Sequence, residues 1–287
     1  EYLAFLLSGE AVTVDPHERL RPWDDERLAA AGLDRRHFPE TSVLPGRVVG
    51  TVTPEIAAEL GFSRHTRVVS GNVDAFAHWI GVDLAQKGRL CNIGGTSEGA
   101  SLSWTRRIDD PQGRVHNIPS PFGDGVLVGG SMSNGGSVID WMVRSLYPPG
   151  TALGDVMAQI ERVPAGSEGL IALPYLLGER TPLHDPDARG VLFGIAPSHG
   201  RQHFARAMLE GVSLGLRWII EILADLGAHT DEIVVTGGTS NSRTWNAIKA
   251  NVTGKPVLVP EVSASGVLGA AVLARSRNRI ARSPPAT

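Results

Sequence analysis

The sequence has few of the features that mark secreted, membrane or nucleic-acid-binding proteins. Its single cysteine, Cys91, excludes a disulfide within the chain and fits a reducing cytoplasm, the location we expect. A formal net charge of -3 gives no electrostatic basis for binding nucleic acid or an anionic membrane. The best candidate for a membrane span, 216–226, carries Arg217, Glu221 and Asp225, so we expect none.

Several familiar site motifs are absent as well. The chain has no G-x-x-x-x-G-K-[ST] phosphate loop and no G-x-G-x-x-G dinucleotide fingerprint. Its nine histidines are scattered and, with one cysteine, give no metal-ligand spacing, so we assign no metal ligands. Any site for a polyphosphate must therefore be built locally, from backbone groups and hydroxyls.

What is present is a pattern of short apolar strands and amphipathic helices. Strands are predicted over 66–69 and 233–235, each followed by a helix, over 74–80 and 243–252. Between 89 and 130 the strand-like segments are separated by glycine turns, which favours antiparallel pairing. The longest predicted helix covers 202–226. Strands of both kinds with helices predict a mixed α/β sheet.

Three glycine-rich junctions are candidates for an anion or nucleotide site. Glycine lets backbone N–H groups approach a phosphate, and a helix that follows adds a partial positive charge. Each junction also has a plainer interpretation, as a hairpin turn or as an ordinary helix cap. Three of them in one chain favour a nucleotide site more than any one alone. The candidate residues are Gly94, Gly95, Thr96 and Ser97; Gly135 and Gly136; and Gly237, Gly238, Asn241 and Ser242.

Two further features could carry chemistry. Gly95–Gly99 matches G-x-S-x-G, the nucleophile elbow of α/β-hydrolases with Ser97 as nucleophile, but the elbow needs a helix after the serine, and 100–105 alternates like a strand. Asp74 is a lone acid between a glycine turn and an apolar helix. The charged segment 174–190 lies between two apolar runs, so we interpret it as a structured loop near a site.

With these pieces in order, the sequence resembles the FGGY family of carbohydrate kinases, nearest its xylulokinase branch. The most specific matches are "LPYLLGERTPLHDPDARGVLFGI" and the helix "ARAMLEGVSLGLRWIIEIL". "NIGGTSEG" resembles the family's second phosphate loop, and "VTGGTSNSRTWNAIKANVTGKPV" its adenosine segment. "SGNVDAFAHWIGV" resembles the end of the first domain, where the family has its catalytic aspartate.

The resemblance implies an actin-like, ribonuclease-H-like ATPase fold of two domains, with a mixed sheet and helices on both faces. It implies ATP and Mg²⁺ as cofactors and a sugar as substrate, most simply a ketopentose such as xylulose. Asp74 would be the general base that contacts the sugar. Gly94 to Ser97 would bind the ATP phosphates, and Gly135, Gly136, Gly237, Gly238, Asn241 and Ser242 the nucleoside.

The chain also departs from the family pattern. The family's first strand and D-x-G-T phosphate loop have no counterpart, and the chain opens at Glu1 inside a predicted helix, so we expect a portion of a longer protein. Residues 1–88 would be the end of an incomplete sugar-binding domain, 89–274 the ATP-binding domain, and 275–287 a disordered tail. We expect weak or no kinase activity from this chain alone. The alternative is a non-catalytic remnant, or one half of a split kinase, that binds nucleotide; a homo-oligomer also stays open.

Overall fold

The computed structural model describes residues 1–14, 24–39 and 41–275. The predicted disordered tail therefore lies outside the described residues, apart from Arg275, which ends a helix. Contacts divide the chain into two compact units. Unit 1 consists of Glu1–Gly81, Pro121–Gly123 and the segment from Gly266 onward, and unit 2 of Val82–Ser120 and Asp124–Ser265. The two-domain division at residue 88 stays a prediction.

Unit 1 contains two small sheets and several short helices. Strands β1 (Val12–Val14) and β2 (Thr41–Val43) pair in parallel, and β3 (Val48–Thr51) and β4 (Arg67–Val69) pair antiparallel. A small core forms around Val52, Ala57 and Val68. The helices described in this unit are α1 (Tyr2–Ser8), α2 (Asp25–Ala30), the 3₁₀ turn η1 (Arg35–His37), α3 (Pro54–Leu60), α4 (Asp74–Gly81) and, from Gly266 on, α9 (Ser265–Arg275).

Unit 2 is built on a six-stranded mixed sheet in the order β12-β11-β5-β6-β8-β7. Strand β11 is parallel to β5 and β12, whereas β6, β7 and β8 pair antiparallel. This confirms the predicted antiparallel segment between residues 89 and 130. The bounds are β5 Arg89–Gly94, β6 Glu98–Trp104, β7 His116–Pro119, β8 Val126–Met132, β11 Glu232–Thr236 and β12 Val257–Leu258.

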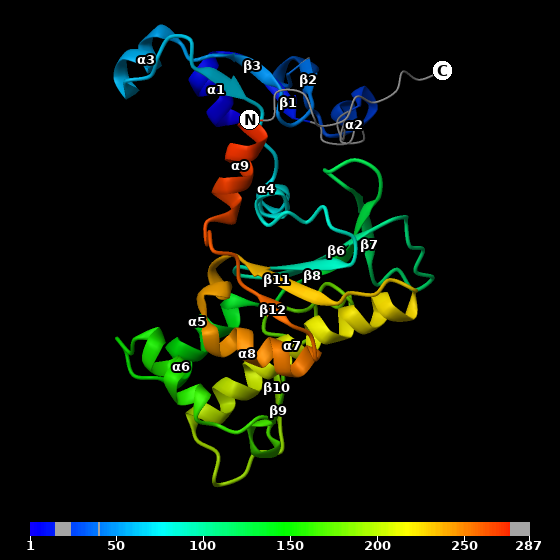
Figure 1. Ribbon diagram of the computed structural model, residues 1–287, viewed down its shortest axis with the longest axis vertical. Coiled ribbons are helices and arrows are strands. Elements are labelled where there is room, and N and C mark those ends of the chain that lie inside the picture. Colours follow the sequence, from blue (N-terminus) through cyan, green and yellow to red (C-terminus); the bar gives the residue numbers. More distant parts are fainter. Residues whose placement is uncertain (15–23, 40, 276–287) are drawn as a thin grey trace. The chain divides into compact units, whose positions relative to one another are not determined.

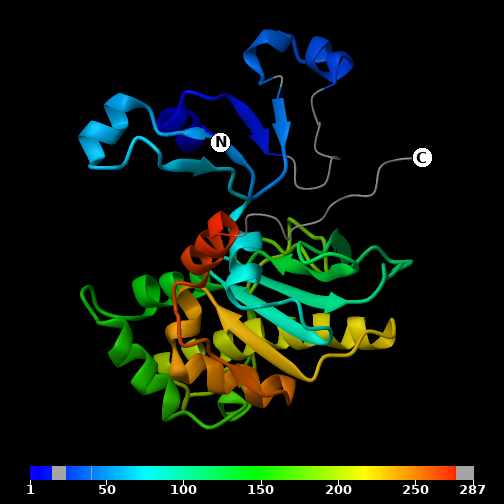
Figure 2. The same ribbon diagram turned by 45° about the horizontal axis from the view of Figure 1, so that its top comes forward.

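Four helices of unit 2 form a second layer on this sheet (Figures 1 and 2). The longest, α7 (Arg201–Asp225), buries an apolar stripe that includes Met208, Leu216 and Leu223, because these positions recur at helical spacing. It packs against α5 (Gly136–Leu146), α6 (Leu153–Glu161) and α8 (Arg243–Thr253). The predicted helices over 202–226 and 243–252 are confirmed within one residue at each end.

Beside α7 lies a smaller antiparallel pair, β9 (Ile171–Leu173) with β10 (Val191–Phe193). It follows the 3₁₀ turn η2 (Ser167–Gly169). The charged segment 174–190 joins its two strands and is structured, as predicted, since Glu179 and Asp185 form a bridge within it.

The strand register brings the three glycine-rich junctions to one edge of the sheet. Ile93 is opposite Thr236 in the parallel pair, and Glu98 is opposite Met132 in the antiparallel pair. The turn after β5, the loop between β8 and α5, and the 3₁₀ turn η3 (Gly238–Asn241) after β11 therefore all begin at that edge. This edge is where the candidate site lies.

Candidate functional site

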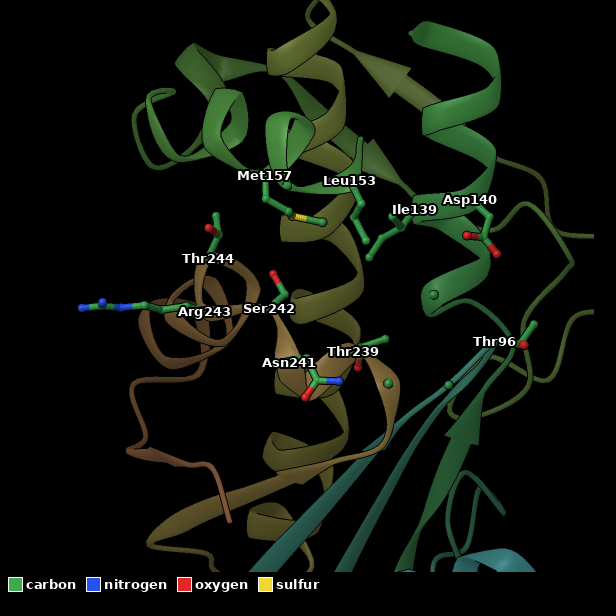
Figure 3. Close-up of a pocket in the computed structure, with 14 residues that line it drawn as sticks. Thr96, Ile139, Asp140, Leu153, Met157, Thr239, Asn241, Ser242, Arg243 and Thr244 are labelled. Atoms are coloured by element: carbon green, nitrogen blue, oxygen red, sulfur yellow. The ribbon is translucent and has the colours of Figure 1, made fainter. Parts of the chain in front are cut away.

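A pocket of about 510 Å³ opens at this edge of unit 2 (Figure 3). Its walls come from the turn after β5, from α5, from the start of α6, and from η3 with the start of α8. The residues that line it are Gly95, Thr96, Gly136, Ile139, Asp140, Leu153, Gly154, Met157, Gly238, Thr239, Asn241, Ser242, Arg243 and Thr244.

The turn after β5 and the start of α5 are held together by their backbones. The Gly136 N–H donates to the Gly95 carbonyl at 2.7 Å, and the Ser137 N–H donates to the Thr96 carbonyl at 3.1 Å. These first N–H groups of α5 are therefore used to fix the loop. A Cβ on Gly136 would lie 2.6 Å from the Gly95 oxygen, so this contact requires glycine.

The turn after β5 also packs closely against the segment after β11. Gly237 has φ +82, and a Cβ there would lie 2.3 Å from the Gly94 carbonyl oxygen. A Cβ on Gly94 would lie 1.6 Å from Thr239 Oγ1. Both positions thus need glycine, the first for its backbone conformation and both for the close approach.

The structure brings most of the sequence-predicted residues together. Six of them line the pocket, namely Gly95, Thr96, Gly136, Gly238, Asn241 and Ser242. Gly94, Ser97, Gly135 and Gly237 do not line it but belong to the same three junctions, and Gly135 is packed against the Ser97 backbone. The nucleotide-binding roles of these residues stay predictions.

Sequence reasoning missed the apolar wall of the pocket. In Figure 3 the side chains of Ile139, Leu153 and Met157 lie opposite Thr239, Asn241 and Ser242. Ile139 and Asp140 come three and four positions after Gly136, one helical turn into α5, which was a usable signal. Sequence reasoning did not single out α6, because its apolar residues look like those of any amphipathic helix.

A buried ionic cluster lies directly behind the turn after β5. The Lys249 ammonium on α8 is 3.0 Å from Glu98 Oε2, and these two side chains are 1% and 0% exposed. Lys249 Nζ also donates to Asn92 Oδ1 at 2.6 Å, and Thr239 Oγ1 donates to Glu98 Oε1 at 3.1 Å. The sequence offered one signal, since Lys249 follows Trp245 by four residues on the apolar face of its helix.

The structured loop 174–190 supports the second glycine junction. Glu179 Oε1 accepts from the Ser133 N–H at 2.5 Å, and Asn134 Nδ2 donates to the Gly178 carbonyl at 2.7 Å. Burial, together with the Glu179 charge, raises the pKa of the Tyr175 phenol. The segment is structured, as predicted, and it holds the residues that lead into α5. That it lies near a functional site stays a prediction.

Asp74 is the first residue of α4 and is exposed. Its Oδ1 accepts from the Ala75 N–H at 2.8 Å. It belongs to unit 1, whereas every residue that lines the pocket belongs to unit 2. Its catalytic role therefore stays a prediction from the family resemblance.

Ser97 is not on a nucleophile elbow. Strand β5 ends at Gly94 and strand β6 begins at Glu98, so their antiparallel pairing makes Gly95–Ser97 a hairpin turn. The helix that an elbow requires is absent at this position, so the hydrolase alternative is wrong.

The described residues bear on three further possibilities: a metal site, a membrane-spanning helix and a reactive cysteine. There, no three His, Cys, Asp or Glu side chains are grouped so that they could hold a metal ion. Within the same residues, no helix combines the length and apolar character needed to cross a bilayer. Cys91 is buried in β5, and burial raises the pKa of its thiol, which makes it a poor nucleophile.

Known proteins match this chain in sequence and in structure. The family described as "FGGY family of carbohydrate kinases, C-terminal domain" matches residues 90–276. A gluconokinase of Bacillus subtilis (strain 168) is 34% identical over 261 residues, 88% of this chain and 50% of that protein. A xylulose kinase of the same organism is 32% identical over 284 residues, 96% of this chain and 56% of that protein. The chain thus spans about half the length of the curated relatives it matches.

A solved structure, the ligand-bound xylulose kinase from Lactobacillus acidophilus, superposes with a TM-score of 0.79. It is 28% identical, and the match covers 96% of this chain and 57% of that one. This likeness confirms the predicted α/β class with the actin-like ATPase fold. Because the family match covers most of the chain, the protein belongs to the FGGY family of carbohydrate kinases.

Proposed function

We propose that unit 2 binds ATP in the pocket at the sheet edge. The phosphates would lie against Gly94–Ser97, and the nucleoside against Gly135, Gly136 and the segment Gly237–Ser242. One observation carries this proposal. Three glycine junctions far apart in the sequence contribute Gly95, Gly136 and Gly238 to one pocket.

The chemistry of the walls fits a nucleotide. Ligand pockets are usually about 300–1,000 Å³ in volume and mostly apolar, with a few polar groups that fix orientation. Ile139, Leu153 and Met157 would pack on the base, while the hydroxyls and amide of Thr96, Asn241 and Ser242 would bind polar groups. Bound ATP would supply the γ-phosphoryl group for transfer.

Mg²⁺ would enter with the nucleotide. Proteins usually bind Mg²⁺ through one or two carboxylates together with substrate phosphates, and not in an all-protein cage. The pocket lining contains one carboxylate, Asp140, which is compatible with that mode of Mg²⁺ binding.

The reaction we propose is phosphorylation of a sugar hydroxyl with Asp74 as general base. Its exposed carboxylate at the start of α4 would accept the proton of the attacking hydroxyl. The sugar is proposed to be a ketopentose such as xylulose, and the similarity to a gluconokinase makes gluconate the second substrate to test. A cytoplasmic location stays a prediction.

The test is ADP release by the chain with Mg-ATP, with and without D-xylulose, D-gluconate and related sugars. We expect at most weak sugar-stimulated turnover from this chain alone, and we expect Asp74→Asn to lower that turnover by a further factor of about 10² to 10⁴. Turnover that survives Asp74→Asn would remove the base assignment. No turnover with any sugar would overturn the catalytic proposal for this chain and favour a nucleotide-binding remnant or half of a split kinase.

A further inference from the structure

Glu98, Lys249 and Asn92 form a buried polar cluster behind the pocket. All three side chains are 1% exposed or less. Lys249 Nζ lies 3.1 and 3.0 Å from the two carboxylate oxygens of Glu98 and 2.6 Å from Asn92 Oδ1. Each of the three N–H groups of the ammonium thus has an acceptor, and Nζ lies 4.7 Å from the Trp245 ring centroid.

The cluster joins both ends of one pocket loop to the opposite wall. Asn92 precedes the loop Gly94–Ser97 by two residues, and Glu98 follows it directly. Asn92 Nδ2 donates to Glu98 Oε2 at 2.5 Å, which closes the base of the loop. Lys249 lies on α8, and Thr239, which lines the pocket from η3, donates to Glu98 Oε1 at 3.1 Å.

Stability alone does not account for such a cluster. Replacing a buried ion pair by apolar side chains of similar volume is often neutral or stabilising, because desolvation of the charges offsets their attraction. What apolar packing cannot supply is direction. A satisfied network of hydrogen bonds fixes the spacing and orientation of the elements it connects.

We propose that Glu98 and Lys249 are positioning residues that set the spacing between the loop Gly94–Ser97 and the segment Gly238–Ser242. With that spacing fixed, one nucleotide contacts both walls at once, its phosphates at the first and its nucleoside at the second. This inference rests on the proposed nucleotide site. It assigns a role to two residues that do not themselves line the pocket.

The experiment compares two probes that differ only in their phosphates. Isothermal titration calorimetry on the 287-residue chain gives the Kd of ADP and the Kd of adenosine. Their ratio reports how well phosphate contacts add to nucleoside contacts. We expect Lys249→Met to lower the ratio of the adenosine Kd to the ADP Kd by about tenfold, because a misplaced loop loses the phosphate contacts first.

A matched control is available in α7. Arg206 and Glu210 form another well-buried pair, 2.8 Å apart with side chains 9% and 12% exposed, and neither lines the pocket. Arg206→Met also leaves a buried carboxylate with one partner fewer. It should lower the thermal midpoint but leave the ratio of the two Kd values unchanged.

A double variant, Glu98→Leu with Lys249→Met, separates positioning from stability. It removes both charges together, so it should recover much of the thermal midpoint lost in Lys249→Met. The ratio of the adenosine Kd to the ADP Kd should stay as low as in Lys249→Met. A wild-type ratio in either variant would overturn the inference. Absence of ADP binding to the wild-type chain would overturn the proposed nucleotide site, and the inference with it.

Discussion

Gly237 offers the sharpest test of how the pocket is built. Its backbone has φ 82 and ψ -177, a region that residues with a Cβ rarely occupy. Such a conformation costs a non-glycine residue on the order of 1–3 kcal/mol. A methyl group at this position would also lie 2.3 Å from the Gly94 oxygen and 3.0 Å from the Gly94 carbonyl carbon. Relieving that overlap by a backbone shift adds about 1–3 kcal/mol.

The two terms together predict that Gly237→Ala lowers the free energy of unfolding by about 2–6 kcal/mol. This is a large share of the roughly 5–15 kcal/mol that stabilises a typical protein. The neighbouring Gly238 is the matched control. A Cβ at Gly238 would meet nothing within 4 Å, and the φ of Gly238 is not in the left-handed region. We therefore expect Gly238→Ala to have the same free energy of unfolding as wild type.

Urea unfolding followed by circular dichroism measures both variants. The midpoint should fall for Gly237→Ala, with an unchanged slope, and stay within error for Gly238→Ala. Equal midpoints for the two variants would refute the reasoning, because they would mean that the backbone at Gly237 does not approach Gly94 as described.

Two further predictions concern groups away from the pocket. Hydrogen bonds from the Arg114 side chain lower the pKa of Asp110 to about 2, below its unfolded value of about 4. Asp110 therefore stabilises the fold above pH 4 and loses that effect as the pH falls toward 2, so the stability gap between wild type and Asp110→Asn should close over this range. A gap that does not change with pH would contradict the pairing. Because Cys91 is buried, we expect a thiol reagent to leave it unlabelled in the native protein and to label it fully in guanidinium. Rapid labelling of the native protein would show that β5 is not buried.

The elements of unit 2 were largely predictable because their signals are local. Alternation and glycine turns predicted the antiparallel strands, and apolar residues at helical spacing predicted α7 and α8. The glycine junctions were predictable for the same reason, since Gly237 and Gly94 need a conformation or a close approach that only glycine allows.

What the sequence did not reveal depends on contacts between distant segments. The apolar wall from α6 could not be predicted, because Leu153 and Met157 look like ordinary amphipathic positions until the sheet brings them opposite Asn241. The pairing of Glu98 with Lys249 joins positions 151 residues apart, and no local pattern connects them. The grouping of α9 with unit 1 is likewise non-local: a Cβ on Gly269 would lie 1.8 Å from the Ala77 carbonyl oxygen of α4.

The central claim is that nucleotide binds in the pocket of unit 2, and a pocket-filling variant tests it most directly. Gly154 lines the pocket, and a Cβ at this position would meet nothing within 4 Å, so Gly154→Trp should fill the space without disturbing the core. The measurement is the Kd of ADP by isothermal titration calorimetry for wild type and Gly154→Trp, with thermal unfolding as the check on folding. We predict that wild type binds ADP and that Gly154→Trp, with an unchanged thermal midpoint, binds it at least about tenfold more weakly, because the indole occupies the place of the nucleoside. Equal ADP affinity in the two proteins would contradict the account and put the nucleotide elsewhere.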